Sequence, residues 1–501
     1  MSRQKTISKK NIPKNVLWTL EQLHNNGYEG FIVGGCVRDL IMKKNPHDWD
    51  ITTNATPEQI IAIFEQTDRR VVYENNFGTV GIINKELEKD TPDYAIEITP
   101  YRSEGHYSDK RRPDTVSFST HISEDLKRRD FTMNALAYDP FSETLIDKYE
   151  GIHDIENGVI RTVGNPDERF SEDALRMMRA VRFSAQLGFI CETETLSSLR
   201  KNIPLMKHVS PERIRDEFLK LIDADYAVDG ILLMQKITML SLIVPELEEG
   251  INCDQGGAHI YDVFEHNLKS FEHAVNKSYS LHVKLAALFH DIGKPRSRRK
   301  ANGRGTKEWT FYGHEVIGAN MSRDIMKRLK FPKELSDKVE KLVRYHMFFS
   351  DPDAITLSAV RRMVANVGEE MIWDLMDLRT CDRIGTGRPK EKPYRLRKYH
   401  AMIEEVLRDP ISVGMLKING DIMIGEMGMK PGKRMGWILH ALLEEVLEDP
   451  TKNTREYLEP RVRAFDELSD TELQELGEQA KHQKDILEQE EVKKLHRKHK
   501  V

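Results

Sequence analysis

The chain has 501 residues and a formal net charge of −5, with 39% hydrophobic and 31% charged residues. At about 150 residues per domain this length predicts about three folded units, and the apolar content excludes a wholly disordered chain. No apolar stretch approaches the roughly 20 residues that a membrane-spanning helix requires, so we expect no membrane partner. Because the net charge is slightly acidic, any nucleic-acid site must come from local basic clusters.

The cysteines and the N-terminus predict a reducing, cytoplasmic location. Four cysteines lie far apart and form no CxxC pair, which argues against a disulfide framework and against a zinc ribbon. The first residues, MSRQKTISKKNIPKN, carry cations but precede no apolar block of the kind found in secretory signals. We therefore expect free thiols and no signal peptide.

Hydrophobic periodicity predicts a mixed α/β region over about the first 140 residues. Residues 30–33 predict a strand, Gly34-Gly35 a tight turn, and residues 37–42 the start of a helix. From about residue 166 the strand signal fades, and Pro and Gly residues separate predicted helices as far as a polar tail that begins near residue 466. Further strands are predicted at 48–51, 70–73, 79–83 and 94–99, with a hairpin turn at 75–78.

Two carboxylates follow the glycine turn. Asp48 and Asp50 are two residues apart, and in a strand such residues point to the same face, where both oxygens can hold a divalent ion. Gly34-Gly35 lets backbone N–H groups approach a phosphate, with Arg38 one helical turn behind. The alternative is ordinary surface strand chemistry, and Glu97 is either a third acidic group or a solvent-facing strand residue.

The stretch from Ser171 to Phe183 predicts a capped helix with acidic residues in its first turn. Four charged residues recur at every third position and should therefore lie along one side of that helix. A salt-bridged exposed face is the alternative, although interleaved Met, Ala, Val and Phe residues leave little room for a solvated helix. The four residues are Asp173, Arg176, Arg179 and Arg182.

An aspartate and an arginine together could read a nucleotide base. Cytosine and adenine present a ring-nitrogen acceptor beside an amine donor, whereas uracil and guanine present a ring N–H beside a carbonyl. Arginine offers only donors and ionised aspartate only acceptors. Arg176 at the ring nitrogen and Asp173 at the amine would accept C and A and reject U and G, because each mispaired buried group costs about 1–3 kcal/mol. Arg179 and Arg182 would remain for phosphates.

The block RRDFTMNA at residues 128–135 offers two further arginines. Arg128 and Arg129 suit a triphosphate, while Asp130 and Asn134 could meet the ribose or brace the arginines. A structural ion-pair cluster is the alternative for this block.

Together these blocks resemble a bacterial class II tRNA nucleotidyltransferase, the CCA-adding enzyme family of the polymerase-beta-like superfamily. The matching blocks are GGCVRD at 34–39, DWD at 48–50, YRSEGHYSDKRRPDTVSF at 101–118, RRDFTMNA at 128–135 and EDALRMMRAVRF at 172–183. The resemblance implies that Asp48 and Asp50 bind magnesium, and that side chains select CTP and then ATP for addition to tRNA without a template. It also implies nucleotide contacts from Gly35, Arg38, Arg129, Asp173, Arg176, Arg179 and Arg182.

Relatives of that family include CC-adding enzymes, A-adding enzymes and poly(A) polymerases. Segment 101–118 is similar to the loop that full CCA enzymes use when they switch to ATP. The chain also lacks the long basic block of bacterial poly(A) polymerases. Both features favour addition of all three nucleotides. The alternatives are an A-adding enzyme or poly(A) polymerase, and an RNA-binding phosphohydrolase with an idle polymerase site, against which the intact Asp48 and Asp50 argue.

A second group of histidines and aspartates follows in the helical region. One histidine on a helix is usually a core or surface residue, but six such groups in this order resemble an HD-superfamily phosphohydrolase. Imidazole and carboxylate suit Mn, Ni, Fe, Co or Zn, and a bound metal would lower the pKa of a water that attacks a phosphoester. The resemblance implies His266, His290, Asp291 and Asp382 as ligands, with His314 and His346 at a second metal position.

This second group predicts an additional activity, either a phosphatase or a 2′,3′-cyclic phosphodiesterase. Beside this second group lies a basic run, which could contact phosphate or could be a simple basic loop. Its cations are Lys294, Arg296, Arg298 and Arg299. The turn-rich segment 425–433 resembles the region of these enzymes that follows tRNA, or is an interhelical turn.

The predicted fold class is α+β, with a polymerase-beta-like head followed by helices. We expect a catalytic head at 1–150, a helical neck at 151–250 that binds the base and RNA, an HD domain at 251–400, and a helical C-terminal region at 401–501.

Overall fold

The computed structural model describes residues 7–73, 78–104, 116–256, 260–300, 309–348, 355–473 and 476. The chain divides into two compact units, residues 1–243 and 244–501. Within the described ranges, none of the helices combines the length and the apolar character needed to span a bilayer. The finer division into head, neck, HD domain and C-terminal region stays a prediction.

The first unit contains a seven-stranded sheet with the order β3-β4-β5-β2-β1-β8-β9. Its centre pairs β2 with β5 in parallel and β2 with β1 antiparallel. Alternating burial follows the pleat, as in β5, where Ile96 and Ile98 are buried and Glu97 is exposed. The strands are β1 (Gly30–Val33), β2 (Trp49–Thr53), β3 (Arg70–Tyr73), β4 (Val80–Ile83), β5 (Ala95–Pro100), β8 (Leu136–Asp139) and β9 (Thr144–Asp147).

Most of the predicted strands are confirmed. The strand at 30–33 matches β1, and β3 pairs antiparallel with β4, although turn residues 75–77 lie outside the described residues. Strand β2 begins at Trp49, so Asp48 lies just before the strand and not in it. Sequence periodicity missed β8, whose four residues are all buried and therefore show no alternation. It also missed β9 and the short hairpin of β6 (Arg102–Glu104) and β7 (Val116–Phe118).

Helices pack on the sheet through apolar stripes. Helix α1 (Lys14–Asn25) buries Leu20 and Leu23, and α3 (Pro57–Phe64) buries Ile60 and Phe64. Helix α4 (Ile122–Lys127) contributes Leu126 to a cluster that includes strands β1 and β8. Helix α2 (Gly35–Ile41) follows β1 directly, as the glycine turn predicts.

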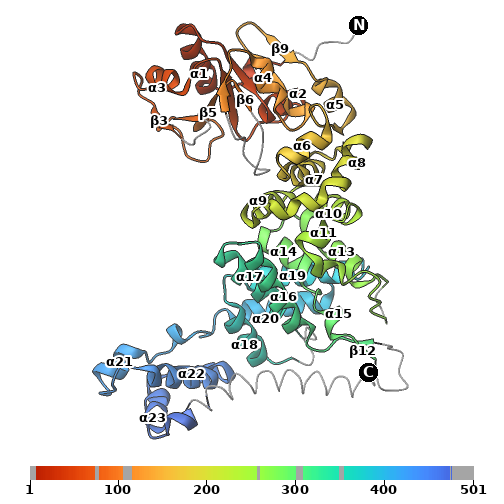
Figure 1. Ribbon diagram of the computed structural model, residues 1–501. Helices are drawn as coiled ribbons and strands as arrows, with labels where there is room; N and C mark the ends of the chain where they lie inside the picture. Colours follow the sequence, from red (N-terminus) through yellow and green to blue (C-terminus); the bar gives the residue numbers. More distant parts are fainter. Residues whose placement is uncertain are drawn as a thin grey trace. The chain divides into compact units, whose positions relative to one another are not determined.

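Helices follow the sheet in the first unit, and the fading strand signal after residue 166 is confirmed apart from two-residue strands (Figure 1). The helices are α5 (Gly151–Asn157), α6 (Pro166–Glu172), α7 (Leu175–Leu187), α8 (Thr193–Asn202), α9 (Pro211–Ile222), α10 (Ala227–Lys236) and α11 (Leu240–Ile243). The short strands after the sheet are β10 (Val159–Ile160), β11 (Ile190–Cys191), β12 (Arg299–Lys300) and β13 (Trp309–Thr310).

The prediction of a helix that begins at Ser171 is wrong. Helix α6 starts at Pro166, capped by the side chain of Asn165, and ends at Glu172. Asp173 is extended, with φ −138° and ψ 104°, and α7 starts two residues later. The carboxylate of Asp173 accepts a hydrogen bond from the backbone N–H of Leu175 at 3.1 Å. A short acidic side chain that bonds local backbone competes with helix continuation, so Asp173 precedes the helix that carries the three arginines.

The second unit is helical within its described residues, apart from β12 and β13. Helices α13, α14, α16, α17 and α19 pack together, and their shared interior contains the second cluster of predicted site residues. The helices are α12 (Pro245–Glu248), α13 (Val263–Asn276), α14 (Leu281–Phe289), α15 (Lys294–Ser297), α16 (His314–Arg328), α17 (Lys333–Tyr345), α18 (Leu357–Val367), α19 (Ile372–Gly385), α20 (Tyr394–Val406), α21 (Gly420–Gly425), α22 (Lys433–Glu448) and α23 (Arg455–Asp466). The segment 425–433 is the turn between α21 and α22.

Candidate active site and candidate metal centre

The predicted carboxylates meet at the parallel pair of strands in the sheet. Asp50 on β2 lies opposite Glu97 on β5 in the strand register, and Asp48 directly precedes β2. Burial, together with the negative charges of Asp48 and Glu97, raises the pKa of Asp50 to about 7. Asp50 and Glu97 line a cavity of about 260 Å³ that also contains Arg128 and Arg129. The arrangement therefore concentrates negative charge next to two guanidinium groups.

The glycine turn allows close approach to this cavity. Gly34 has a φ of 80°, and a Cβ atom there would lie 3.0 Å from the Nη1 atom of Arg129 and 3.8 Å from Oδ2 of Asp50. Gly35 begins α2, and Arg38 on that helix donates to Asn134 Oδ1 at 2.9 Å and to Asp39 Oδ1. Arg38 is thus held between α2 and the segment that carries Asn134.

Arg128 and Arg129 are anchored by one buried carboxylate, Asp125 on α4. Arg129 Nη2 donates to Asp125 Oδ2 at 3.0 Å, and Arg128 donates to Oδ1 of the same side chain. These ion pairs outweigh the effect of burial and lower the pKa of Asp125. The sequence analysis missed Asp125, although its spacing of three and four residues before the two arginines was a usable signal.

Asp130 contacts an arginine of α7, as one of the two predicted roles for this residue expects. Its Oδ2 accepts from Arg179 Nε at 2.7 Å, and its Oδ1 accepts from Asn134 Nδ2 at 3.3 Å. Burial would raise the pKa of Asp130, but Arg179 outweighs burial and lowers this pKa to about 2.

Partners from α9 hold two of the predicted base- and phosphate-binding residues. Arg213 donates to both carboxylate oxygens of Asp173, at 3.2 and 2.7 Å. Glu217, one turn further along α9, pairs with Arg182 at 2.7 Å. The sequence analysis missed both α9 residues, and their i,i+4 spacing on one amphipathic helix was the only sign of a shared face.

The arginines of α7 make further contacts, with backbone groups and with an aromatic ring. Arg176 donates to the carbonyl oxygens of two residues outside its helix and to Glu172 at 2.5 Å. The ring of Phe183 lies 3.8 Å from the guanidinium carbon of Arg182, and 5.3 and 5.4 Å from those of Arg38 and Arg179. Burial lowers the pKa of Arg182 to about 10, with a contribution from the positive charges of Arg179 and Arg38. One ring therefore organises guanidinium groups from α2 and α7.

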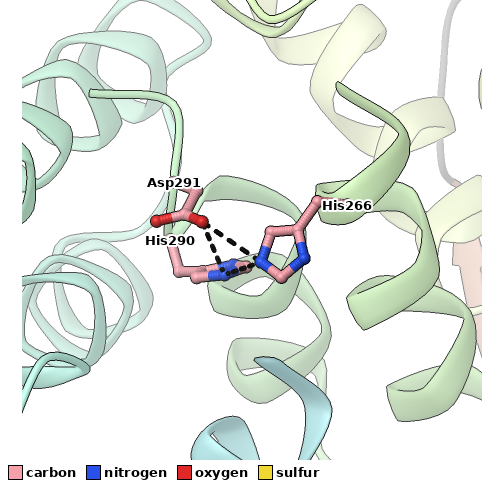
Figure 2. Close-up of side chains that lie close together, drawn as sticks. All are labelled: His266, His290 and Asp291. Atoms are coloured by element: carbon pink, nitrogen blue, oxygen red, sulfur yellow. Dashed lines mark hydrogen bonds and ion pairs between the residues drawn. The ribbon is translucent and has the colours of Figure 1, made fainter. Parts of the chain in front are cut away.

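In the second unit, His266, His290 and Asp291 point toward one another (Figure 2). His266 comes from α13, and His290 and Asp291 follow the end of α14. His266 Nε2 lies 3.0 Å from His290 Nε2 and 3.1 Å from Asp291 Oδ2. Asp382 on α19 joins the group, with its Oδ1 atom 3.4 Å from His266 Nε2.

The other oxygen of Asp291 faces a second pair of imidazoles. Asp291 Oδ1 lies 3.2 Å from His314 Nε2 and 3.5 Å from His346 Nε2. All five of these imidazole and carboxylate residues are buried: His266, His290, Asp291, His314 and His346. Asp291 therefore bridges two groups of candidate ligands, as the two predicted metal positions require.

Backbone carbonyls orient three of the histidines. The Nδ1 atoms of His290, His314 and His346 lie 2.9, 2.7 and 2.7 Å from the carbonyl oxygens of the residues three positions before them. A hydrogen bond at Nδ1 leaves Nε2 as the lone-pair atom, which is how proteins prepare histidine for metal binding. Burial lowers the pKa of His290 to about 3, so its imidazole is neutral. The donor set thus fits divalent metal ions.

The cations of the basic run beside this centre contact different partners. Lys294 is buried, with its Nζ atom 2.5 Å from Asp291 Oδ2 and 2.6 Å from Gln255 Oε1. Arg296 pairs with Glu249, and Arg298 lies over the ring of Trp309 at 3.8 Å. Of the four cations, Lys294 is the one that lies directly against the candidate metal ligands.

Three family models match this chain: Poly A polymerase head domain at 30–161, Probable RNA and SrmB- binding site of polymerase A at 188–251, and HD domain at 263–384. A CCA-adding enzyme of Geobacillus thermodenitrificans is 32% identical over 450 residues, covering 88% of this chain and 95% of that protein. A CCA-adding enzyme of Lactobacillus helveticus is 30% identical over 451 residues, with coverage of 89% and 96%. The crystal structure of the Bacillus stearothermophilus CCA-adding enzyme in complex with CTP has a TM-score of 0.62 and 27% identity, covering 91% of this chain and 99% of that one. The chain therefore belongs to the family of CCA-adding enzymes.

Proposed function

We propose that this protein adds C, C and A to tRNA 3′ ends, with CTP and ATP as substrates and without a nucleic-acid template. The observation that carries this proposal is the convergence of Asp48, Asp50 and Glu97 beside Arg129 at the parallel strands of the sheet. The relatives named as CCA-adding enzymes and the similar structure that binds CTP support the same reaction. Free cysteines, with Cys36, Cys253 and Cys381 buried, are compatible with the cytoplasm as its location.

The carboxylate group fits magnesium. Oxygen ligands suit this ion, and a cation would relieve the repulsion that raises the pKa of Asp50. Asp48 and Asp50 would hold the ion, with Glu97 as a possible third ligand, and bound magnesium would activate the 3′-hydroxyl and neutralise the leaving pyrophosphate. Arg129, fixed by Asp125 near Asp50, supplies positive charge for the triphosphate of the nucleotide.

We assign base selection to Asp173, just before α7, and to Arg176 in the first turn of that helix. Asp173 would accept a hydrogen bond from the exocyclic amine of cytosine or adenine, and Arg176 would donate to the ring nitrogen. Arg38, Arg179 and Arg182 would bind phosphates. We expect Asp173→Ala to relax discrimination against UTP in single-nucleotide incorporation, and unchanged selectivity would contradict this assignment.

An incorporation assay tests the main proposal against its runner-up. A tRNA that lacks its last three nucleotides is incubated with each nucleoside triphosphate alone and then with all four, and the 3′ ends are sequenced. Ends that gain C, C and A support the proposal. Addition of A alone, or of a long A tail, supports an A-adding enzyme or poly(A) polymerase instead. Most of segment 101–118, which favours ATP addition, lies outside the described residues.

We also propose a metal-dependent phosphohydrolase activity for the second unit, and its carrying observation is the bridging position of Asp291. One oxygen of Asp291 faces His266 and His290, and the other faces His314 and His346. Burial would lower the pKa of His266, but Asp291 and Asp382 outweigh burial and raise it to about 9, so the site attracts positive charge. Transition metals such as Mn, Ni, Fe, Co or Zn suit these donors, and a bound metal would supply an activated water.

Metal content and hydrolysis test the second activity. The purified protein is stripped with a chelator, reloaded with each metal separately, and assayed for phosphate release from a 3′-phosphorylated oligonucleotide and for opening of a 2′,3′-cyclic phosphate. Bound transition metal and metal-dependent hydrolysis of either substrate support the proposal. Protein that binds metal but hydrolyses neither substrate contradicts it.

A further inference from the structure

The ion pair between Asp173 and Arg213 points to a role for α9 in base selection, and this inference rests on the proposed function. Arg213 lies on α9 and Asp173 lies between α6 and α7, so the contact joins segments that are 40 positions apart. Their side chains are 25% and 17% exposed, respectively. The pair is therefore shielded by the surrounding helices but remains open to a ligand.

The hydrogen bonds around the Asp173 carboxylate leave one oxygen with spare capacity. Oδ1 accepts from the Leu175 N–H at 3.1 Å and from Arg213 Nη1 at 3.2 Å. Oδ2 accepts from Arg213 Nη2 at 2.7 Å, and that is its only hydrogen-bond donor among the described residues. Each carboxylate oxygen has about two lone-pair sites. Oδ1 is thus filled, and Oδ2 can accept one more hydrogen bond.

We propose that Arg213 is a positioning residue for nucleotide choice. Its two donors fix the plane of the Asp173 carboxylate, so that Oδ2 presents a single free acceptor to the incoming base. An exocyclic amine of cytosine or adenine satisfies that acceptor. A carbonyl oxygen of uracil or guanine at the same place would meet another acceptor, and a carboxylate locked by Arg213 cannot rotate away from it.

Helix α9 has the rigidity that this role requires. It starts with Pro211 at its first turn, and Phe218 and Leu221 on its apolar face are fully buried. Helix α9 packs against α7, and Glu217 holds Arg182 of α7 at 2.7 Å. The same helix thus fixes the acidic residue through Arg213 and one of the arginines through Glu217.

The test compares Arg213→Gln with Arg213→Lys in single-turnover incorporation at a tRNA 3′ end. The quantity measured is the ratio of kcat/KM for CTP to kcat/KM for UTP. We expect Arg213→Gln to lower this ratio by about tenfold or more, because a mobile carboxylate no longer imposes the full cost of a mispaired acceptor. Arg213→Lys keeps the charge but loses the two-point contact, so an intermediate ratio is expected.

Arg215→Gln is the matched control, because Arg215 lies on the same helix and pairs with the adjacent Asp216. Its CTP to UTP ratio should equal that of the wild type. In the Asp173→Asn background, adding Arg213→Gln should not change the ratio further, since the residue through which it acts has already been altered.

Three results would overturn the inference. They are an unchanged ratio in both Arg213 variants, an equal fall in Arg215→Gln, and an effect of Arg213→Gln that persists undiminished in the Asp173→Asn background. If Arg213→Gln is unstable, the comparison is made with Arg213→Lys. Thermal melting and CTP incorporation show that Arg213→Lys is folded. Failure of the wild type to add C to tRNA would instead contradict the proposed function.

Discussion

Three charged side chains around the nucleotide site pair with residues from distant parts of the sequence. Arg179 pairs with Asp130. Arg182 is paired with Glu217 and Asp173 with Arg213. Such pairing is physically necessary, since a buried guanidinium without a carboxylate would carry a desolvation cost of several kcal/mol. Phe183 also stabilises the arginines of this site without a charge of its own, because its ring lies near three guanidinium groups.

We predict that Phe183→Leu weakens nucleotide binding as well as the stability of the fold. Loss of the ring removes cation–π contacts of about 0.5–1 kcal/mol each, and the guanidinium groups of Arg38, Arg179 and Arg182 become less ordered. The KM for CTP should rise by roughly three- to tenfold, and the free energy of unfolding should fall by about 2 kcal/mol, the sum of the lost ring contacts. Steady-state kinetics and urea denaturation measure the two effects.

Phe218→Leu provides the control for packing alone. Phe218 is fully buried on α9, and no guanidinium group among the described residues lies over its ring. This variant should lose similar stability with an unchanged KM for CTP. Equal rises in KM for both variants would show that packing, and not the arginine contacts, explains the effect of Phe183.

A second prediction at this scale concerns acid stability. The pKa of Asp130 in the folded protein is about 2, below the ordinary value of 3.8, so its ion pair with Arg179 stabilises the fold above pH 3.8 and loses this contribution as the pH falls toward 2. Asp130→Asn should therefore lower the free energy of unfolding by about 2 kcal/mol at pH 6. The difference from the wild type should shrink between pH 4 and about pH 2. Urea denaturation at each pH measures it, and a difference that stays constant over this range would contradict the prediction.

At the scale of whole elements, close backbone contacts set the position of the metal-binding helices. A Cβ atom on Gly293 would lie 2.2 Å from the carbonyl oxygen of His314 and 2.6 Å from the backbone nitrogen of Gly318. Only glycine allows the turn after Asp291 to lie this close to α16. This contact helps to explain how His314 reaches the Oδ1 atom of Asp291.

We predict that Gly293→Ala lowers metal occupancy of the second unit. The added methyl group must push α16 away from the turn, which separates His314 from Asp291 and weakens the second group of ligands. Mass spectrometry of the purified protein should find less bound transition metal, while CTP incorporation stays at the wild-type level. Gly436→Ala in α22, where a Cβ atom meets nothing within 4 Å, should leave both quantities unchanged.

The strands, turns and helices also differ in how far the sequence could predict them. The order of the strands along the chain and the glycine turn followed from local patterns, because alternation and turn residues act over a few positions. The helix break at Asp173 was missed. Its carboxylate bonds the N–H of Leu175 two positions on, but also Arg213, which is 40 positions away and invisible to local periodicity. Strand β8 was missed because both of its faces are buried. Motifs predicted the site residues, whereas their charge partners Arg213 and Glu217 lie in a separate helix and required the structure.

At the scale of the whole molecule, two compact units each hold one candidate reaction centre. The carboxylates of the sheet lie within residues 1–243, and the imidazole cluster lies within residues 244–501. Each centre obtains its ligands and its supporting residues from its own unit: Asp125, Asp130 and Glu217 support the first, and Lys294 and Gln255 support the second. The supporting residues named for each centre therefore belong to the unit that holds that centre.

This separation predicts that single substitutions divide the two activities. Asp50→Ala removes a candidate magnesium ligand, so nucleotide addition should fall by at least about a thousandfold while hydrolysis and transition-metal content stay unchanged. Asp291→Ala removes the bridging carboxylate between the two histidine pairs, and should abolish hydrolysis and transition-metal binding while CCA addition continues. Both activities are measured on the same preparations, with the metal content determined in parallel and circular dichroism confirming the fold. Loss of both activities in either variant would contradict two independent centres. Loss of hydrolysis in Asp50→Ala with its full transition-metal content would show that both reactions use the carboxylates of the sheet.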